Sequence, residues 1–305
     1  MSKEYPIVLE ELEIKFSTEE SCREYLFSLR WPNGYICPKC GNDKAWPVRK
    51  ILYECSKCHY QVSVIAGTIF QDTRKPLTIW FRAIWWISSQ KNGASALGLK
   101  RILGLKSYET AWTMLHKLRV AMVRPERDKL SGYVEVDETY WGAEKHGKRG
   151  RGAGGKMLIV VAVEVKLKGL GRIRLKRIPD ASSLSLNGFI SENIEKGSTV
   201  HTDGLSSYLG LESYGYKHNI TVISGQDENA SKLLPHVHRV ISLWERWILG
   251  THQGAVSEKH MDYYLDEYTF RFNRRTSNYR GKLFYRLLEN AVIIEPITYE
   301  KIISR

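Results

Sequence analysis

Two short stretches of this chain contain aspartates that are suited to metal-dependent chemistry. Residues 133–142 read YVEVDETYWG, in which apolar and acidic residues alternate up to Asp137, as in a half-buried strand. The stretch STVHTDG at 198–204 predicts a second strand that ends at Asp203. On parallel neighbouring strands the two carboxylates would converge on one sheet edge and repel each other unless a cation lay between them. We expect either a site for Mg²⁺ or Mn²⁺, which prefer such oxygen ligands, or two aspartates that merely cap turns.

Four of the five cysteines form two close pairs. Cys37 and Cys40 are followed, after 14 intervening residues, by Cys55 and Cys58, so that the pattern is CxxC…CxxC. Each pair fits a tight turn whose two thiolates face one ion, and two such turns complete a tetrahedral site. We therefore expect a structural Zn²⁺ in a zinc ribbon. Redox-active pairs are the alternative, and Cys22 is expected to be an ordinary buried thiol.

The charge balance favours a polyanionic partner. The 305 residues include 46 Lys and Arg against 33 Asp and Glu, a net charge of +13, and the isoelectric point is near 9.4. Such a balance is typical of proteins that bind nucleic acid. The apolar runs are shorter than the ~20 residues of a membrane span, and the first residues show no signal-peptide pattern. We expect a soluble intracellular protein without a membrane partner.

The order of sequence patterns divides the chain into three predicted zones. Residues 1–70 hold an amphipathic helix at about 18–29 and the zinc ribbon. Residues 71–128 look helical, with apolar periodicity that begins after Pro76. From 129 to 305, strand patterns alternate with helical ones, which predicts an α/β domain.

The segment 95–122 predicts a helix-turn-helix. Two short helices are separated at Gly104, and Ser107 suits the cap of the second one. Lys117 and Arg119 are expected to lie off the apolar stripe of that helix, where they could contact DNA. A plain αα-hairpin is the alternative. The stripe consists of Ala111, Met114, Leu115 and Leu118.

A glycine-rich basic segment partly matches the sequence pattern of a nucleotide-binding loop. Residues 150–156 match GxxxxGK, but Met157 replaces the Ser or Thr that would bind the metal, and a strand pattern follows where a helix is needed. We expect instead a basic loop that contacts the DNA backbone through Lys148, Arg149, Arg151 and Lys156. The strand pattern at 171–178 adds a basic face, for which DNA contact and solvation are both open: Arg172, Arg174 and Lys176.

Three longer motifs give a more specific indication. VDETYWGAEKHGKRGRG, HTDGLSSY and LPHVHRVISLWERWILGTHQGAVSEKHMDYYLDEYTFRFNRR resemble the zinc-ribbon insertion-sequence transposases with an ISXO-like DDE catalytic domain. The resemblance implies an α/β RNase H-like fold, with Asp137 on the first strand of the catalytic domain and Asp203 on the fourth. It places the family's third active-site position, which varies among Glu, Asn and His, at His238, with 34 residues between it and Asp203.

One position departs from the family pattern. The family usually has Lys seven residues after the third position, where this chain has Glu245, followed by Arg246. Because seven residues make about two helical turns, His238 and Glu245 share a helix face. Glu245 could supply the third carboxylate; alternatively, Arg246 takes the basic role and Glu245 is peripheral, or this copy is impaired. No specific role follows for three nearby residues, Glu135, Glu138 and His201.

The resemblance implies a DNA transposase. The zinc ribbon and helix-turn-helix would bind the terminal inverted repeats of an insertion sequence, and Asp137 and Asp203 would hold Mg²⁺ or Mn²⁺ for hydrolysis at each end. The freed 3′-hydroxyl would attack target DNA, and joining two ends implies a homo-oligomer on DNA, in the cytoplasm and associated with the nucleoid. Two alternatives stay open: a catalytically inactive, transposase-derived DNA-binding regulator, and a nuclease of the same fold that acts on RNA–DNA hybrids or junctions.

Overall fold

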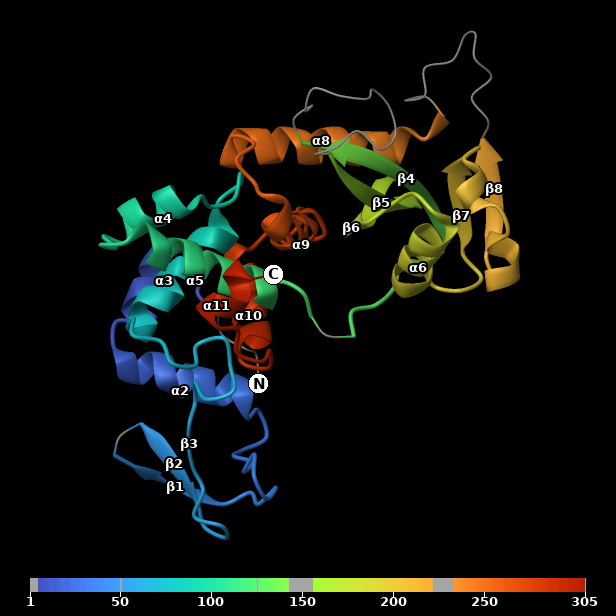
Figure 1. Ribbon diagram of the computed structural model, residues 1–305. Helices are drawn as coiled ribbons and strands as arrows, with labels where there is room; N and C mark the ends of the chain where they lie inside the picture. The colour runs from blue at the N-terminus through green and yellow to red at the C-terminus, as the bar shows by residue number, and fades with distance from the viewer. Residues whose placement is uncertain (1–4, 50, 125, 143–155, 222–232, 305) are drawn as a thin grey trace. The chain divides into compact units, whose positions relative to one another are not determined.

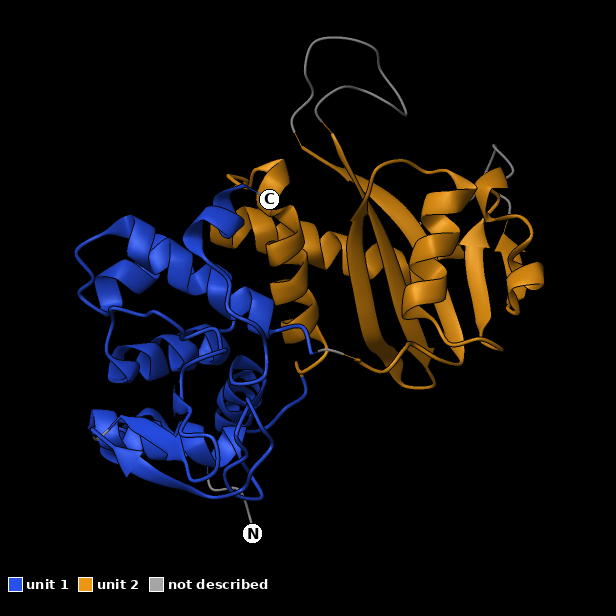
Figure 2. Ribbon diagram, turned by 60° about the horizontal axis from the view of Figure 1, so that its bottom comes forward, with its two compact units in different colours: residues 1–125, 276–305 blue, residues 126–275 orange. Residues whose placement is uncertain are grey.

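The structure is a computed structural model that describes residues 5–49, 51–124, 126–142, 156–221 and 233–304. The chain forms two compact units, one of residues 1–125 with 276–305 and one of residues 126–275 (Figure 2). This division differs from the three predicted zones, because the last segment of the chain groups with the N-terminal unit and not with the α/β domain.

The N-terminal unit begins with two helices and a small antiparallel sheet. The elements are α1 (Leu9–Lys15), α2 (Glu19–Arg30), β1 (Ala45–Val48), β2 (Leu52–Cys55) and β3 (Gln61–Ser63). Thr18 caps α2 by accepting a 3.1 Å hydrogen bond from the backbone N–H of Ser21. Arg30, at the end of α2, donates to the backbone carbonyls of Ser63 and Val64. These bonds join the helix to the last strand of the ribbon.

The remainder of this unit is helical in the residues described. Its helices are α3 (Leu77–Ser89), α4 (Ala96–Ile102), α5 (Tyr108–Ala121), α10 (Arg280–Ala291) and α11 (Tyr299–Ile303). The ring of Phe284 on α10 lies 5.8 Å from the rings of both Phe81 and Trp85 on α3. Asn290 donates a 2.8 Å hydrogen bond to the carbonyl of Ala121. The C-terminal segment therefore completes the core of this unit, and none of the helices in the described ranges is long and apolar enough to cross a membrane.

The α/β unit is built, in its described residues, on a five-stranded mixed sheet of order β6-β5-β4-β7-β8 (Figure 1). The strands are β4 (Tyr133–Trp141), β5 (Met157–Lys166), β6 (Gly169–Ile178), β7 (Thr199–Asp203) and β8 (Lys217–Thr221). Central β4 is antiparallel to β5 and parallel to β7. Helix α6 (Ser183–Asn193) covers one face, and α8 (Pro235–His252) and α9 (Met261–Phe272) cover the other. The connections contain the 3₁₀ turns η1 (Ser206–Tyr208), η2 (Leu211–Tyr214) and η3 (Glu258–His260).

The alternation of side chains along β4 distributes its acidic residues over both faces of the sheet. Val134 and Val136 are fully buried and pack on the side of α6. Glu135 and Asp137 therefore point to the face that α8 covers, whereas Glu138 points to the face of α6. β5 is buried on both faces, which explains its uninterrupted apolar run.

Candidate functional site

Asp203 ends β7 as predicted, whereas Asp137 lies in the middle of β4, which continues to Trp141. The parallel ladder between β4 and β7 pairs Glu135 with His201, and each aspartate is two residues further along its strand. Asp137 Oδ1 accepts a 2.8 Å bond from the backbone N–H of Glu138, and Asp203 Oδ1 accepts one of 3.0 Å from Leu205. The two predicted strands are thus parallel neighbours, and Asp203 also caps the turn that follows it.

His238 reaches Asp137 from helix α8. Its Nε2 lies 3.6 Å from Asp137 Oδ2, and the side chains of His238 and Asp137 are 32% and 14% exposed. Burial lowers the pKa of His238, and the nearby carboxylates of Glu135 and Asp203 only partly oppose this effect. The imidazole is therefore neutral at pH 7 and faces the acid of β4.

Glu245 lies further along the same interface. Its carboxylate accepts a hydrogen bond from Thr139, which points to the same face of β4 two residues after Asp137. Burial raises the pKa of Glu245, and the bond from Thr139 opposes that shift. Arg246, the next residue, is exposed. The structure thus brings His238 to Asp137 and Glu245 to Thr139.

Tyr208 binds the acidic residue that follows Asp137. Its buried hydroxyl donates a 2.8 Å hydrogen bond to Glu138 Oε2 on the α6 side of β4. Burial raises the pKa of Tyr208 well above its ordinary value, and the charges of Glu138, Asp137 and Asp203 raise it further. Tyr208 therefore stays protonated and donates its hydrogen bond to Glu138.

His201 connects neighbouring strands of the sheet. Its Nδ1 lies 2.8 Å from the hydroxyl of Tyr133 on β4, and its Nε2 lies 2.7 Å from Thr221 Oγ1 on β8. Burial lowers the pKa of His201 despite the charge of Glu135. This histidine therefore links three strands as a neutral side chain.

The four cysteines are brought together as predicted. Among the described residues they form the one group of three or more Cys, His or acidic side chains that could hold a metal ion, with all four sulfur atoms within 4.8 Å of one another. Cys37 and Cys58 lie 3.7 Å apart, and Cys40 and Cys55 lie 3.6 Å apart, measured between Sγ atoms. The cluster has the ligands and the spacing of a structural zinc site.

The two cysteine turns share one backbone design. In each, the N–H of the first cysteine donates to the carbonyl five residues later, at 2.8 and 3.0 Å, and its carbonyl accepts from the N–H four residues later, at 2.9 and 3.0 Å. The residue at that fourth position has a left-handed backbone: Gly41, with φ of +73°, and His59, with φ of +55°. The tight turn predicted from Gly41 is confirmed, and a histidine adopts the same conformation in the second turn.

This backbone design favours the thiolate form of the first cysteine in each turn. Burial alone would raise the pKa of Cys37, but the N–H groups of Cys40 and Lys39 outweigh it and hold the pKa at about 6. The pKa of Cys55 is lowered by the equivalent N–H groups in the second turn, again against burial. The thiolate is the form that binds Zn²⁺. Burial raises the pKa of Cys22 to about 12, as expected of an ordinary buried thiol.

The predicted helix-turn-helix exists as α4 and α5, but one of its side chains lies elsewhere than expected. The break occurs at Gly104, with φ of +61°, and the four stripe residues are buried. The expectation for Arg119 is wrong: it is 1% exposed, and its guanidinium lies 3.4 Å from His116 and 3.5 Å from the carbonyl of Ala94. The reason is periodicity, because Arg119 follows Ala111 by eight residues and so falls at the border of the stripe.

Two smaller expectations for this segment are also revised. Lys117 is half-buried and donates a 3.4 Å bond to the carbonyl of Ile69, and burial lowers its pKa. Ser107 stands at the start of α5, but its side chain makes no capping hydrogen bond within the described structure. Exposed residues of the segment include Arg101 near the end of α4, and Lys106 and Tyr108 around the start of α5.

The predicted basic loop is described in part. Lys148, Arg149 and Arg151 lie outside the described residues. Lys156 is half-buried just before β5 and lines a hollow of about 370 Å³ together with Arg177 and Glu258. Arg177 is already paired with Glu258 at 2.8 Å.

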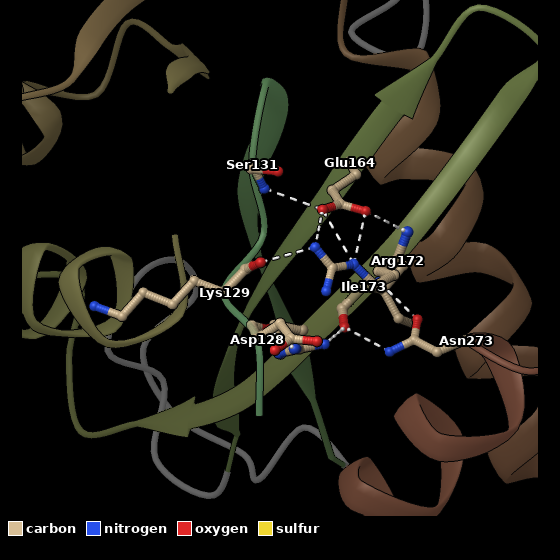
Figure 3. A network of polar contacts seen from close by, with 8 residues as sticks. Asp128, Lys129, Ser131, Glu164, Arg172, Ile173 and Asn273 are labelled. Carbon is tan, nitrogen blue, oxygen red and sulfur yellow. Dashed lines mark hydrogen bonds and ion pairs between the residues drawn. The ribbon is translucent and has the colours of Figure 1, made fainter. Parts of the chain in front are cut away.

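The basic face of β6 is occupied by contacts within the protein (Figure 3). Arg172 donates several hydrogen bonds to the carboxylate of Glu164, the shortest at 2.6 Å. It also donates to the carbonyl of Lys129. Glu164 is 3% exposed and accepts a further bond from the N–H of Ser131 at 3.0 Å. The network therefore fastens the segment that enters the α/β unit to the end of β5.

The other cations of β6 also have partners. Arg174 is buried and donates a 2.6 Å bond to the carbonyl of Asp128, and burial together with neighbouring arginines lowers its pKa to about 10. Lys176 lies 2.6 Å from Glu192 on α6. On the outer edge of β6, the amide of Asn273 pairs with the N–H and C=O of Ile173 (Figure 3). This contact covers backbone groups that an edge strand otherwise leaves open.

Comparison with known proteins identifies two domains of the chain. Residues 129–273 match the model of the ISXO2-like transposase domain, and residues 17–61 match a transposase zinc-ribbon domain. The chain therefore carries an ISXO2-like transposase domain preceded by a transposase zinc-ribbon domain. Its transposase domain has the predicted RNase H-like fold, with Asp137 on the first strand and Asp203 on the fourth. The predicted zinc ribbon is confirmed as well.

One relative of this chain comes from a transposable element. An uncharacterized protein in transposable element ISH50 of Halobacterium salinarum is 25% identical over 277 residues, which cover 84% of this chain and 91% of the relative. Two solved structures give weaker likenesses. One is a simian T-cell lymphotropic virus intasome in complex with PP2A regulatory subunit B56 gamma (13% identity, TM-score 0.33, 63% of this chain and 71% of the other). The second is a pre-cleavage Mos1 transpososome, with 10% identity and a TM-score of 0.27 over 69% of this chain and 78% of the other. At such scores neither carries a functional argument.

Proposed function

We propose that this protein is a DNA transposase that cleaves the ends of its insertion sequence and joins the 3′-hydroxyl ends to target DNA. The observation that carries the proposal is the acidic site within the transposase domain. Asp137 and Asp203 each follow the last ladder pair of two parallel strands by two residues, and His238 lies 3.6 Å from Asp137. The net charge of +13 suits a DNA substrate around that acid.

Asp137 and Asp203 would bind the divalent metal. Their carboxylates are hard oxygen donors, which fit Mg²⁺ or Mn²⁺ and not a thiolate-binding metal. Asp137 is partly accessible, at 14% exposure of its side chain, so that an incoming phosphate can complete the set of ligands. Bound divalent ions supply Lewis acidity to the attacking and leaving oxygens of a phosphodiester.

His238 would occupy the third position. Because burial keeps its ring neutral, a nitrogen lone pair is available beside Asp137 either to bind metal or to accept the proton of the attacking water or hydroxyl. Glu245 would be peripheral, since its carboxylate is engaged by Thr139. Its effect on the reaction would pass through the placement of α8.

DNA recognition would fall to the zinc ribbon and to α4 and α5, which would bind the terminal inverted repeats. In helix-turn-helix proteins the first residues of the second helix contact base edges. The exposed residues there, Lys106, Ser107 and Tyr108, replace Lys117 and Arg119 as candidates. Joining two ends would require a homo-oligomer on DNA. The remaining candidates for backbone contact are Lys148, Arg149, Arg151, Lys156 and Arg246.

Strand cleavage and joining on DNA that carries the repeats flanking this gene test the proposal. In the presence of Mn²⁺ or Mg²⁺, wild-type protein should give cleaved ends and strand-transfer products. Asp137→Asn and Asp203→Asn should bind the same DNA and give neither product. A folded wild-type protein that binds the repeats but neither cuts nor joins them would overturn the proposal in favour of a DNA-binding regulator. Cleavage confined to RNA–DNA hybrids would favour the nuclease instead.

A further inference from the structure

Glu135 is a deeply buried carboxylate next to the acidic site. It precedes Asp137 by two residues on the same face of β4 and is 3% exposed. A carboxylate buried to this degree requires hydrogen-bond partners. Glu135 Oε2 accepts from the backbone N–H groups of both His236 and Val237 at 2.9 Å, and Oε1 lies 2.6 Å from His236 Nδ1.

These partners form the first turn of α8. The first N–H groups of a helix have no intrahelical acceptor, and Pro235 at the start of α8 has no N–H at all. The residue before it, Leu234, provides no side-chain cap. Glu135, which is 101 residues earlier in the chain than His236, therefore performs the capping that a local residue usually performs. Its negative charge also suits the positive end of the helix dipole.

The capping contact sets where α8 sits along β4. Glu135 meets His236, and one pleat further Asp137 meets His238. The first contact consists of three short bonds, two of them to backbone. The second is a single separation of 3.6 Å, too long for a strong hydrogen bond. The position of His238 therefore depends on the stronger contact beside it.

We propose that Glu135 is a positioning residue, which caps α8 and thereby places His238 against Asp137. Its consequence for catalysis rests on the proposed function, whereas the capping itself rests on the contacts alone. Glu138 holds Tyr208 on the opposite face of β4. The two glutamates that flank Asp137 thus each fasten another segment of the site to the strand.

Variants of Glu135 separate the effect of its side-chain length from the effect of its charge. In Glu135→Gln, the amide oxygen can accept both backbone N–H groups in place of Oε2, so the cap is kept without the negative charge. In Glu135→Asp, the charge remains but the oxygens withdraw by one methylene group. In Glu135→Ala, the first turn of α8 loses its cap altogether.

Amide hydrogen exchange of the full chain, resolved by residue, tests the capping. Glu135→Ala and Glu135→Asp should speed exchange at His236 and Val237 by about tenfold or more, and Glu135→Gln should leave it close to the wild-type rate. Glu164→Ala is the matched control, because Glu164 is equally buried but accepts from Ser131. It should speed exchange at Ser131 and not at His236. Unchanged protection of His236 and Val237 in Glu135→Ala would overturn the proposal.

End cleavage tests the positioning. Glu135→Ala and Glu135→Asp should lower the cleavage rate by roughly 10- to 100-fold with unchanged DNA affinity, and Glu135→Gln should restore most of it. In a His238→Ala background the same changes should have no further effect, because Glu135 acts through His238. Equal losses in both backgrounds, or a Glu135→Gln variant as slow as Glu135→Ala, would overturn the inference. An inactive wild-type protein would refute the proposed function, while the exchange data would still decide whether Glu135 caps α8.

Discussion

His238 Nε2 lies 3.6 Å from Asp137 Oδ2, whereas Glu245, two turns later on the same helix, is hydrogen-bonded to Thr139. Since α8 extends along β4, the two candidates for the third position meet different residues of one strand. Of the two candidates, His238 is therefore the one that lies next to Asp137.

Single replacements of His238 and Glu245 should have different effects on end cleavage. His238→Ala should lower end cleavage by roughly 10²- to 10⁴-fold, because the neutral nitrogen beside Asp137 is lost. Glu245→Ala should lower it by less than about tenfold, the scale of one hydrogen bond that helps to seat the helix. Glu245→Gln keeps an acceptor for Thr139 and is the control. A larger loss in Glu245→Ala than in His238→Ala would place the third ligand two turns along α8.

Removing a cysteine ligand should unfold the ribbon and spare the α/β unit. Purified protein should contain about one zinc ion per chain, and Cys55→Ser should lose it together with binding to the terminal repeats. Exchange protection at Val237, in the other unit, should stay unchanged. Cys22→Ala is the control, because its thiol lies outside the cluster, and it should keep the zinc. Metal analysis and amide exchange on the same samples check these outcomes, and zinc retained in Cys55→Ser would contradict them.

A methyl group at Gly171 should destabilise the α/β unit. A Cβ built there would lie 2.7 Å from Glu164 Cβ and 3.0 Å from the carbonyl oxygen of Glu164. Backbone must then shift at the buried network of Figure 3, so Gly171→Ala should lower the free energy of unfolding by about 1–3 kcal/mol. Gly188→Ala, in α6 with open space around it, should instead raise that free energy by up to about 1 kcal/mol. Urea unfolding of both variants measures the difference, and two equal effects would show that Gly171 has room for a side chain.

The Glu164 network should weaken in acid. Burial alone would raise the pKa of Glu164, but hydrogen bonds from Arg172 and from the N–H of Ser131 lower it below its ordinary value of 4.5. Because the folded state holds this carboxyl deprotonated more strongly than the unfolded state does, its contribution to stability is complete above about pH 4.5 and is lost as the pH falls through the folded pKa. The difference in unfolding free energy between wild type and Glu164→Gln should therefore be largest near neutral pH and shrink below about pH 4.5.

Subtracting the two curves removes acid effects common to both proteins, including release of zinc. Glu192→Gln is the control for a carboxylate that pairs with a cation at the surface, since Glu192 and Lys176 are 60% and 48% exposed. That variant should change stability by less than about 1 kcal/mol. A Glu164 difference that grows as the pH falls would contradict the assigned direction of the pKa shift.

Local patterns predicted much of the architecture. Alternation marked β4, and the predicted alternation of strand and helical patterns after residue 129 corresponds to an α/β unit that includes α6 (Ser183–Asn193) and α9 (Met261–Phe272). The doubled cysteine spacing predicted the ribbon, because neighbouring thiolates in one turn can face a common ion without help from distant residues. The position of His238 came from family resemblance, since no local rule distinguishes it from His236 two residues earlier.

Contacts between distant segments explain where side chains lie elsewhere than the sequence predicted. Arg119, at the border of the apolar stripe of α5, is 1% exposed and lies 3.5 Å from the carbonyl of Ala94, which comes from a different segment. The basic face of β6 is bound to Glu164, Asp128 and Glu192, which come from three different segments. A charge pattern along one strand contains no information on which partners arrive from elsewhere.

The sequence by itself determined which residues could do chemistry: the two aspartates, the four thiolates and the basic charge of the chain. Periodicity and spacing encode these features within a few residues of each other. Tertiary structure alone decided that Asp137 and Asp203 lie on parallel neighbouring strands, that His238 and not Glu245 meets Asp137, and that Glu135 caps α8. Those relationships depend on strand register and on the seating of a helix on a sheet. Both are set by side-chain contacts between segments that the chain keeps far apart in sequence.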